Sequence, residues 1–330
     1  MTDDQQIDIS LEKIREASRR IGGSLLKTPC LYSQPLSRRT EGQIYLKMEN
    51  LQVTQAFKAR GNANKIALLK EKGDVNGVIT ASSGNHGLGL SLAARAHGLE
   101  AKVVVPEVAP STKIEKIREN GAEVIVEGDA YDDASILAHQ LAQKLDFTYV
   151  HSFDDPDIIA GNGSMGLEIL EDVPEVDTIV VPIGGGGGIS GISLAAKRIN
   201  DDITVVGVEA ENAPAMYSSV QSGSLSELPN ADTFADGIAV REPGKLTFEI
   251  VRRYVDEIVT VSEEEMKESI YLLAKEAKIV AEAAGAASTA AILFGKVDLD
   301  GGKTVGMVSG GNIDIGPFRE ILRKYDPEGT

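Results

Sequence analysis

The strongest chemical signal in the chain is a run of five consecutive glycines: Gly184, Gly185, Gly186, Gly187 and Gly188. The run stands between the apolar segment TIVVPI and the segment ISGISLAAKRI, which has the composition of a helix. A glycine run at a strand-to-helix turn exposes several main-chain N–H groups in one concavity, beside the positive end of the helix dipole. Such a turn can hold a phosphate without basic side chains. A flexible linker is the alternative, although linkers are rarely flanked by a strand and an apolar helix.

The glycine run leaves the kind of phosphate open. Gly186, Gly188 and Gly191 fit the GxGxxG fingerprint of dinucleotide-binding proteins, and Glu209 lies roughly 20 residues further on, at the end of the next predicted strand. The run by itself therefore predicts a phosphate-bearing ligand, and a dinucleotide is one candidate.

Two more polar turns follow predicted strands. One is SSGNHG at 82–87, where hydroxyls, an amide and main-chain N–H groups at the start of a predicted helix suit an anion such as a carboxylate. The other is SGGN at 309–312. An ordinary helix cap would explain SSGNHG alone. In an open parallel sheet, however, the turns at the carboxyl ends of the strands share the edge where ligands bind, so three such turns predict one site.

Lys58 lies in the segment QAFKARG, with apolar neighbours on its N-terminal side. A lysine amine can bond covalently to an aldehyde and can act as a base when burial brings its pKa toward neutrality. Judged alone, a single lysine is more often a solvated surface charge.

The elements that must position these residues alternate along the chain. Short β-branched runs, for example at 102–106, 178–183 and 204–209, are separated by longer stretches with helical periodicity. This pattern is typical of βαβ units and predicts an α/β fold with mostly parallel sheets. A length of 330 residues, at roughly 150 per domain, suggests two domains. No repeat or low-complexity linker divides the chain, so we expect the second domain as an insertion.

Composition excludes several classes of protein. Apolar residues make up 42% and charged residues 25%, as in globular proteins. The net charge of −17 repels phosphate backbones and anionic lipids, so we expect neither a nucleic-acid nor a membrane partner. A single cysteine, Cys30, permits no internal disulfide and fits a reducing compartment. Because the N-terminal segment has no apolar run, we expect a cytoplasmic protein.

Together the motifs resemble the serine and threonine dehydratases and serine racemases, which are pyridoxal-phosphate enzymes. AFKARG around Lys58, SSGNHG, the glycine run and SGGN occur in the order of that family and at about its separations. The similarity extends through KTPCLYSQPLSRRTEGQIYLKMENLQ, DDPDIIAGNGSMGLEIL and ADGIAVREPGKLTFEIV. It implies a tryptophan-synthase β-like fold with two three-layer α/β domains. Residues 1–76 and 153–330 would form the large cofactor-binding domain, and residues 77–152 the small inserted domain.

The resemblance also implies where pyridoxal 5′-phosphate would bind. The glycine run would hold its phosphate, and Lys58 would form the Schiff base and later serve as the catalytic base. Phe57 and Asn85 would flank the pyridoxal ring and its 3′-oxygen, and Ser309 would meet the pyridine nitrogen.

Substrate roles follow from the same resemblance. The substrate carboxylate would be held by Ser82, Ser83, Asn85 and His86. Ser83 also aligns with the serine that faces the lysine across the substrate in racemases, which makes it a second catalytic candidate.

The implied reaction removes water and ammonia from a β-hydroxy amino acid, so that L-threonine gives 2-oxobutanoate and L-serine gives pyruvate. NAPAMY and ADGIAVREPGKLTFEIV most resemble the catabolic threonine dehydratases, and no C-terminal regulatory domain is expected after SGGN. Serine racemase and 3-hydroxyaspartate dehydratase are the alternatives within the family. A dinucleotide-binding oxidoreductase that uses only the glycine run is the alternative outside it. We expect a homodimer or homotetramer.

The chain departs from the family at its metal site, which uses a glutamate, a main-chain carbonyl four residues later and an acid two further on. Glu209 and Ala213 match the first two positions, but Ala215 stands at the third. Hard cations prefer several anionic oxygens, so we expect a weaker divalent site, a monovalent cation or an empty site.

Overall fold

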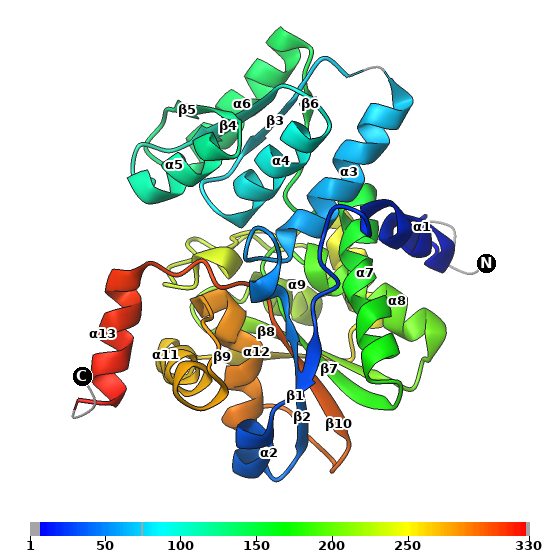
Figure 1. Cartoon of the computed structure of the whole chain (residues 1–330), viewed down its shortest axis with the longest axis vertical. Helices are drawn as coiled ribbons and strands as arrows, with labels where there is room; N and C mark the ends of the chain where they lie inside the picture. The colour runs from blue at the N-terminus through cyan, green and yellow to red at the C-terminus, as the bar shows by residue number, and fades with distance from the viewer. Residues whose placement is uncertain (1–6, 74, 328–330) are drawn as a thin grey trace.

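The computed structural model describes residues 7–73 and 75–327. It contains two sheets, each covered by helices on both faces (Figure 1). The larger sheet has the strand order β1-β2-β10-β7-β8-β9. Neighbouring strands are parallel, except that β1 pairs antiparallel with β2 at one edge. These strands are β1 (Cys30–Tyr32), β2 (Gln43–Met48), β7 (Val176–Pro182), β8 (Thr204–Ala210), β9 (Glu257–Val261) and β10 (Lys303–Val308).

Both faces of the larger sheet are buried under helices. Side chains on a strand point alternately to its two faces, so neighbouring residues of one strand belong to different apolar clusters. Ile179 and Val181 belong to the apolar cluster under α7, α8 and α10, whereas Val180 belongs to the cluster under α2, α11 and α12. These helices are α2 (Gln34–Thr40), α7 (Pro156–Asp172), α8 (Gly187–Ile199), α10 (Lys245–Tyr254), α11 (Glu263–Leu272) and α12 (Ala283–Leu293).

The smaller sheet is fully parallel and has the order β5-β4-β3-β6. Apolar side chains of α4 and α5 pack on one face, and three alanines of α6 pack on the other. The elements are β3 (Val78–Ala81), α4 (Asn85–Ala96), β4 (Ala101–Val105), α5 (Ser111–Glu119), β5 (Glu123–Val126), α6 (Tyr131–Leu145) and β6 (Thr148–Tyr149). This sheet lies inside the chain segment predicted as an inserted domain; the boundaries at residues 76 and 153 stay predictions.

Helix α3 (Lys58–Lys72) runs between the two sheets, next to α4 on one side and α7 on the other (Figure 1). The remaining elements are α1 (Leu11–Ile21), η2 (Glu49–Leu51), α9 (Ala215–Ser222), η3 (Asp236–Ile238), η4 (Leu273–Ala277) and α13 (Ile315–Tyr325). The predicted α/β class with mostly parallel sheets is confirmed.

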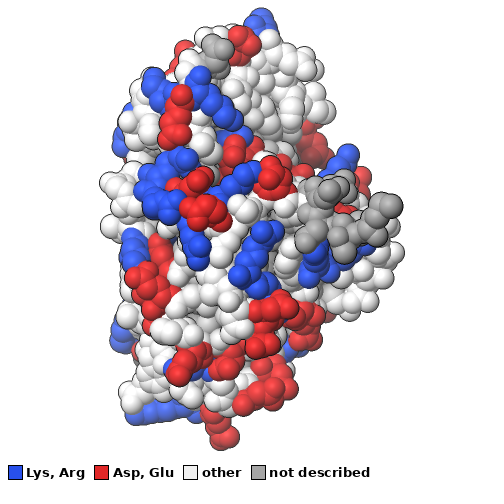
Figure 2. All heavy atoms as spheres, turned by 90° about the vertical axis from the view of Figure 1, so that its right-hand side faces the viewer, with Lys and Arg blue, Asp and Glu red and all other residues white. Residues whose placement is uncertain are grey.

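The surface carries both signs of charge in spite of the acidic composition. Figure 2 shows Lys and Arg side chains lying among Asp and Glu side chains over one face of the molecule. Of the helices in residues 7–73 and 75–327, not one combines the length and the apolar character that crossing a bilayer requires.

Candidate active site

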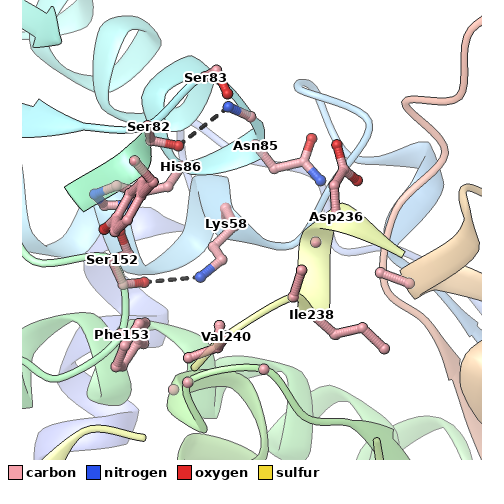
Figure 3. A pocket seen from close by; sticks show the side chains of 18 of the residues that line it. Lys58, Ser82, Ser83, Asn85, His86, Ser152, Phe153, Asp236, Ile238 and Val240 are labelled. Atoms are coloured by element: carbon pink, nitrogen blue, oxygen red, sulfur yellow. Dashed lines mark hydrogen bonds between the residues drawn. The ribbon is translucent and has the colours of Figure 1, made fainter. Parts of the chain in front are cut away.

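One cavity of about 720 Å³ is lined by all three polar turns that the sequence singled out. The glycine run follows β7 and SGGN follows β10, which are neighbours in the larger sheet. SSGNHG follows β3 of the smaller sheet and reaches the cavity from the opposite side. The turns therefore come from two sheets, not from the edge of one sheet as the strand pattern alone predicts. Figure 3 shows the side chains of some of the residues that line this cavity.

Main-chain hydrogen bonds fix Lys58 beside the SGGN turn. The N–H of Phe57 donates to the carbonyl of Ser309 at 3.0 Å, and the N–H of Gly311 donates to the carbonyl of Gln55 at 2.9 Å. Ala56 and Gly310 form an isolated β-bridge between these two bonds. The start of α3 is thereby attached to the carboxyl end of β10, although the two segments lie near opposite ends of the chain.

A buried ionic network holds the first turn of α3 from the other side. The guanidinium of Arg60 donates to Glu49 at 2.8 and 2.9 Å and to Glu168 of α7 at 2.7 and 2.8 Å. Lys47 of β2 also pairs with Glu168, and it donates to the carbonyl of Thr28 at 2.6 Å. Every charge in this group has an opposite partner, so the network positions the helix that begins at Lys58.

The amine of Lys58 has no carboxylate partner among the residues that the structure describes. Its Nζ donates to the main-chain carbonyl of Ser152 at 2.9 Å (Figure 3). Burial lowers the pKa of Lys58 to about 8, because the protein around the cavity solvates the ammonium form poorly. Such an amine is uncharged in a sizeable fraction of molecules near neutral pH, so it can act as a nucleophile or as a base.

The glycine run is sterically obligatory at several positions. A Cβ at Gly185 would lie 2.3 Å from the ring of Phe153, and one at Gly187 would lie 2.8 Å from the Cβ of the same residue. Gly186 has φ 93°, which favours glycine. A Cβ at Gly188 would lie 3.2 Å from the ring of Phe57. The backbone of the run therefore packs against two aromatic rings with no room for side chains.

The main-chain N–H groups of this run have no acceptor within the described residues. Helix α8 begins at Gly187, so the free N–H groups lie at its positive end. Buried main-chain donors are normally paired, and an anion is the ligand that a helix N-terminus with free donors binds best. The glycine run thus fits the phosphate of a cofactor.

SSGNHG forms a second turn with free donors. Helix α4 begins at Asn85, and the N–H of Gly84 donates to the hydroxyl of Ser82 at 3.2 Å. In the structure described here, the main-chain N–H groups of Ser83, Asn85 and His86 have no hydrogen-bond acceptor. The hydroxyl of Ser83 also makes no hydrogen bond to a described residue, and Ser83 lines the cavity. The turn can receive a carboxylate through its main chain.

The imidazole of His86 is occupied elsewhere. Its Nε2 lies 3.1 Å from the carbonyl of Val150, and its Nδ1 lies 3.1 Å from the side-chain nitrogen of Asn62. Burial, with the nearby charge of Lys58, lowers the pKa of His86 to about 3, so the ring is neutral. In that form Nε2 donates to the carbonyl and Nδ1 accepts from Asn62, so only the main chain of His86 is free to meet a ligand.

The side chains of Asn85 and Ser309 also reach the cavity. Asn85 donates to Glu282 at 2.7 Å and accepts from Asn312 at 2.8 Å. Ser309 is 5% exposed, and its hydroxyl makes no hydrogen bond to any described residue. Sequence reasoning missed Glu282, although a lone acid in the apolar segment IVAEAAGAAS was a signal that could have found it.

Glu209 serves as a helix cap. Its carboxylate accepts from the N–H groups of Met216 at 2.9 Å and Tyr217 at 2.7 Å, in the first turn of α9. Burial raises the pKa of Glu209 to about 8. With both oxygens in use and only 1% exposure, Glu209 is unsuited to the ribose contact of a dinucleotide site.

The predicted cation site places Glu209 and Ala213 close together, since both lie where β8 gives way to α9. The described residues hold no cluster of three or more His, Cys, Asp or Glu side chains that could bind a metal ion. Binding of a cation there stays a prediction.

Comparisons with known proteins agree with this geometry. Residues 22–311 match the family described as "Pyridoxal-phosphate dependent enzyme". The chain is 48% identical to the L-threonine ammonia-lyase of Thermotoga maritima, over 96% of this chain and 79% of that protein. It is 42% identical to the catabolic L-threonine dehydratase TdcB of Escherichia coli K12, over 97% of this chain and 98% of that protein.

Among solved structures, maize serine racemase superposes with a TM-score of 0.90 at 33% identity, covering 97% of this chain and 98% of that chain. The resemblance found in the sequence is confirmed, and with it the tryptophan-synthase β-like fold and the cofactor. The chain belongs to the pyridoxal-phosphate-dependent enzymes, among the threonine dehydratases and serine racemases.

Proposed function

We propose that this protein is a catabolic-type L-threonine ammonia-lyase that converts L-threonine to 2-oxobutanoate and ammonia, and L-serine to pyruvate. The observation that carries the proposal is the buried amine of Lys58, which pairs with no acid among the described residues and lies in a cavity with two separate anion-binding turns. One turn suits the phosphate of the cofactor and the other suits the carboxylate of an amino acid. The relatives named threonine ammonia-lyase and threonine dehydratase support the choice of substrate.

Each residue around the cavity has a distinct task in this proposal. The N–H groups of the glycine run would bind the phosphate, and Phe57 would pack beside the ring of the cofactor. Asn85 would donate to the ring oxygen, and the hydroxyl of Ser309 would meet the ring nitrogen. When bound, the cofactor supplies a conjugated ring that withdraws electrons from the α-carbon of the substrate. A neutral serine stabilises a protonated ring nitrogen less than an aspartate would, which favours loss of the β-hydroxyl.

Lys58 is the base in this reaction. Its Nζ takes the proton from the α-carbon while the N–H groups of Ser83, Asn85 and His86 hold the substrate carboxylate. With a pKa of about 8, the amine has the uncharged form that accepting a proton requires.

Ser83 gives the racemase alternative its specific support. Its hydroxyl makes no hydrogen bond to a described residue, and Ser83 lines the same cavity as Lys58. The similarity to maize serine racemase covers nearly the whole chain. A proton delivered by Ser83 to the face opposite Lys58 would yield the D-amino acid. Incubation with L-serine, followed by chiral analysis of serine and an assay of pyruvate, separates the two activities.

The test of the main proposal is a product assay with L-threonine, L-serine and 3-hydroxyaspartate. We expect 2-oxobutanoate from L-threonine at the highest kcat/KM and pyruvate from L-serine at a lower value. No 2-oxo acid from any of the three substrates would reject the proposal. A faster reaction with 3-hydroxyaspartate would reassign the substrate, and D-serine formed faster than pyruvate would reassign the reaction.

We propose a cytoplasmic homodimer or homotetramer that acts on a small amino acid. Light scattering coupled to size-exclusion chromatography decides between these assemblies and a monomer.

A further inference from the structure

Glu282 is a buried carboxyl in the wall of the cavity. It precedes α12 and is 7% exposed. Its N–H donates to the carbonyl of Gly310 at 3.1 Å, and a Cβ at Gly310 would lie 2.3 Å from its Oε1. The SGGN turn therefore needs a glycine at this position to leave space for the carboxyl. This close packing around the carboxyl suggests that Glu282 has a specific role in the cavity.

The hydrogen bonds around Asn85 determine which end of its amide faces which neighbour. The side-chain nitrogen of Asn312 donates to the carbonyl of Thr54 at 2.8 Å, and that carbonyl can only accept. The same nitrogen lies 2.8 Å from the Oδ1 of Asn85, which must accept its second hydrogen. The Nδ2 of Asn85 then faces Glu282, and its distance of 2.7 Å to Oε1 is that of a strong hydrogen bond.

One N–H of Asn85 is left over after these contacts. An amide nitrogen carries two hydrogens, and Glu282 takes one of them. Nδ2 makes no second hydrogen bond to any described residue, and Asn85 lines the cavity. This remaining donor is available to an acceptor in the cavity, such as the ring oxygen of the cofactor.

We propose that Glu282 is a positioning residue, which, together with Asn312, locks the amide of Asn85 so that one N–H points at the cofactor. This inference rests on the proposed contact between Asn85 and the cofactor. Without the acceptor at Glu282, the amide of Asn85 loses the bond that holds its nitrogen in place, and the donor presented to the cavity is no longer fixed.

The charges around Glu282 are consistent with this role. Burial and the nearby carboxylate of Asp236 on η3 raise the pKa of Glu282 to about 7, against the opposite effects of Asn85, Lys113 on α5 and the N–H of Asn312. Lys113 forms an ion pair with Asp236, and Glu282 forms none with any residue that the structure describes. Both the neutral and the ionised carboxyl offer an oxygen to Asn85, so the positioning does not depend on one protonation state.

The test is a double-mutant cycle on cofactor affinity. The apoenzymes of the wild type, Glu282→Ala, Asn85→Ala and the double variant are titrated with pyridoxal 5′-phosphate by equilibrium dialysis. We expect each single substitution to weaken binding about tenfold or more. If Glu282 acts through Asn85, the double variant binds within about threefold of Asn85→Ala alone. A purely structural role would instead give losses that multiply.

Glu242→Gln is the matched control, because it removes the same charge from an exposed residue of the same cavity that does not contact Asn85. We expect its affinity to stay within about twofold of the wild type. If Glu282→Ala does not fold, as judged by circular dichroism, Glu282→Met replaces it in the cycle, because its side chain has a similar volume and no oxygen that can accept from Asn85. Unchanged affinity in the Glu282 variant, or multiplying losses in the cycle, overturns the inference. Because dialysis involves no substrate, this outcome is independent of whether L-threonine is turned over.

Discussion

At the scale of single residues, the proposed function depends on the environment of the Lys58 amine. Lys58 has the chemistry of any lysine, and its burial lowers its pKa to about 8. The carboxyls of Glu209 and Glu282 show the converse effect, since burial raises the pKa of the first to about 8 and that of the second to about 7. Glu209 caps a helix, so a perturbed pKa alone does not identify a catalytic group.

Replacement of Lys58 by alanine tests the covalent link to the cofactor and the base together. We expect Lys58→Ala to lose the absorbance of lysine-bound cofactor and to turn over L-threonine at least about 1000-fold more slowly. The apoenzyme should melt at the same temperature or higher, because the substitution removes a buried amine that forms no ion pair with any described residue. Lys70→Ala, at an exposed site on the same helix, should behave as the wild type. Normal turnover by Lys58→Ala would show that another group is the base.

The pKa of Lys58 also predicts how the apoenzyme takes up its cofactor. Only the uncharged amine attacks an aldehyde, so the rate of reconstitution should rise about tenfold per pH unit up to about pH 8 and then level off. A surface lysine, with a pKa near its usual value, would still be accelerating above pH 10. The reaction of pyridoxal phosphate with Nα-acetyl-lysine corrects for the ionisation of the cofactor. A rate that keeps rising above pH 9 would contradict the burial of this amine.

At the scale of elements, the close fit between the glycine run and Phe153 makes a steric prediction. The methyl group of Gly185→Ala would meet the ring at 2.3 Å, so either the loop or the ring must move. We expect the substitution to weaken binding of pyridoxal phosphate at least about tenfold and to destabilise the protein by about 1–3 kcal/mol. Gly316→Ala on α13 is the control, because no atom lies within 4 Å of its new methyl group. Calorimetry and cofactor titration of both variants provide the comparison.

Elements with a local signature were predictable from the sequence, and those held by distant partners were not. TIVVPI predicted β7, because a strand buried on both faces is apolar throughout. Strand β2 was missed because it lacks such an apolar run: Lys47 stands next to its last residue, where it is buried only with the help of Glu168 and Thr28 from elsewhere in the fold. The role of Glu282 was not predictable for the same reason: its partner Asn85 begins α4, which follows β3 of the smaller sheet, far from Glu282 in the sequence.

At the scale of the whole molecule, the cavity exists only where the two sheets face each other. The glycine run and SGGN follow strands of the larger sheet, and SSGNHG follows a strand of the smaller sheet. The distance between the phosphate site and the carboxylate site therefore depends on how the two halves of the molecule, one around each sheet, pack together. No pattern within either half records that packing, which explains why the motifs predicted a shared site but placed it at the edge of a single sheet.

Two ion pairs at the mouth of the cavity connect the part of the chain around the smaller sheet with the part around the larger sheet. Lys113 of α5 pairs with Asp236 of η3, and Asp132 of α6 pairs with Arg241 at 2.9 Å. All four residues line the cavity, so both pairs must loosen if the mouth widens to admit an amino acid. Exposed pairs of this kind stabilise by less than about 1 kcal/mol each, so they can shift the balance between open and closed forms without holding the fold together.

The double variant Lys113→Met, Asp132→Asn should therefore bind substrate less well and remain as stable as the wild type. Loss of up to about 2 kcal/mol from the closed form predicts a KM raised by up to about 30-fold, with kcat within about twofold and a melting temperature within a few degrees. Salt screens exposed pairs, so sodium chloride should raise the KM of the wild type and leave that of the variant nearly constant. Lys324→Met, which removes an exposed pair with Glu264 away from the cavity, controls for the loss of charge. Equal salt dependence of KM in all three proteins would show that the pairs do not control access to the site.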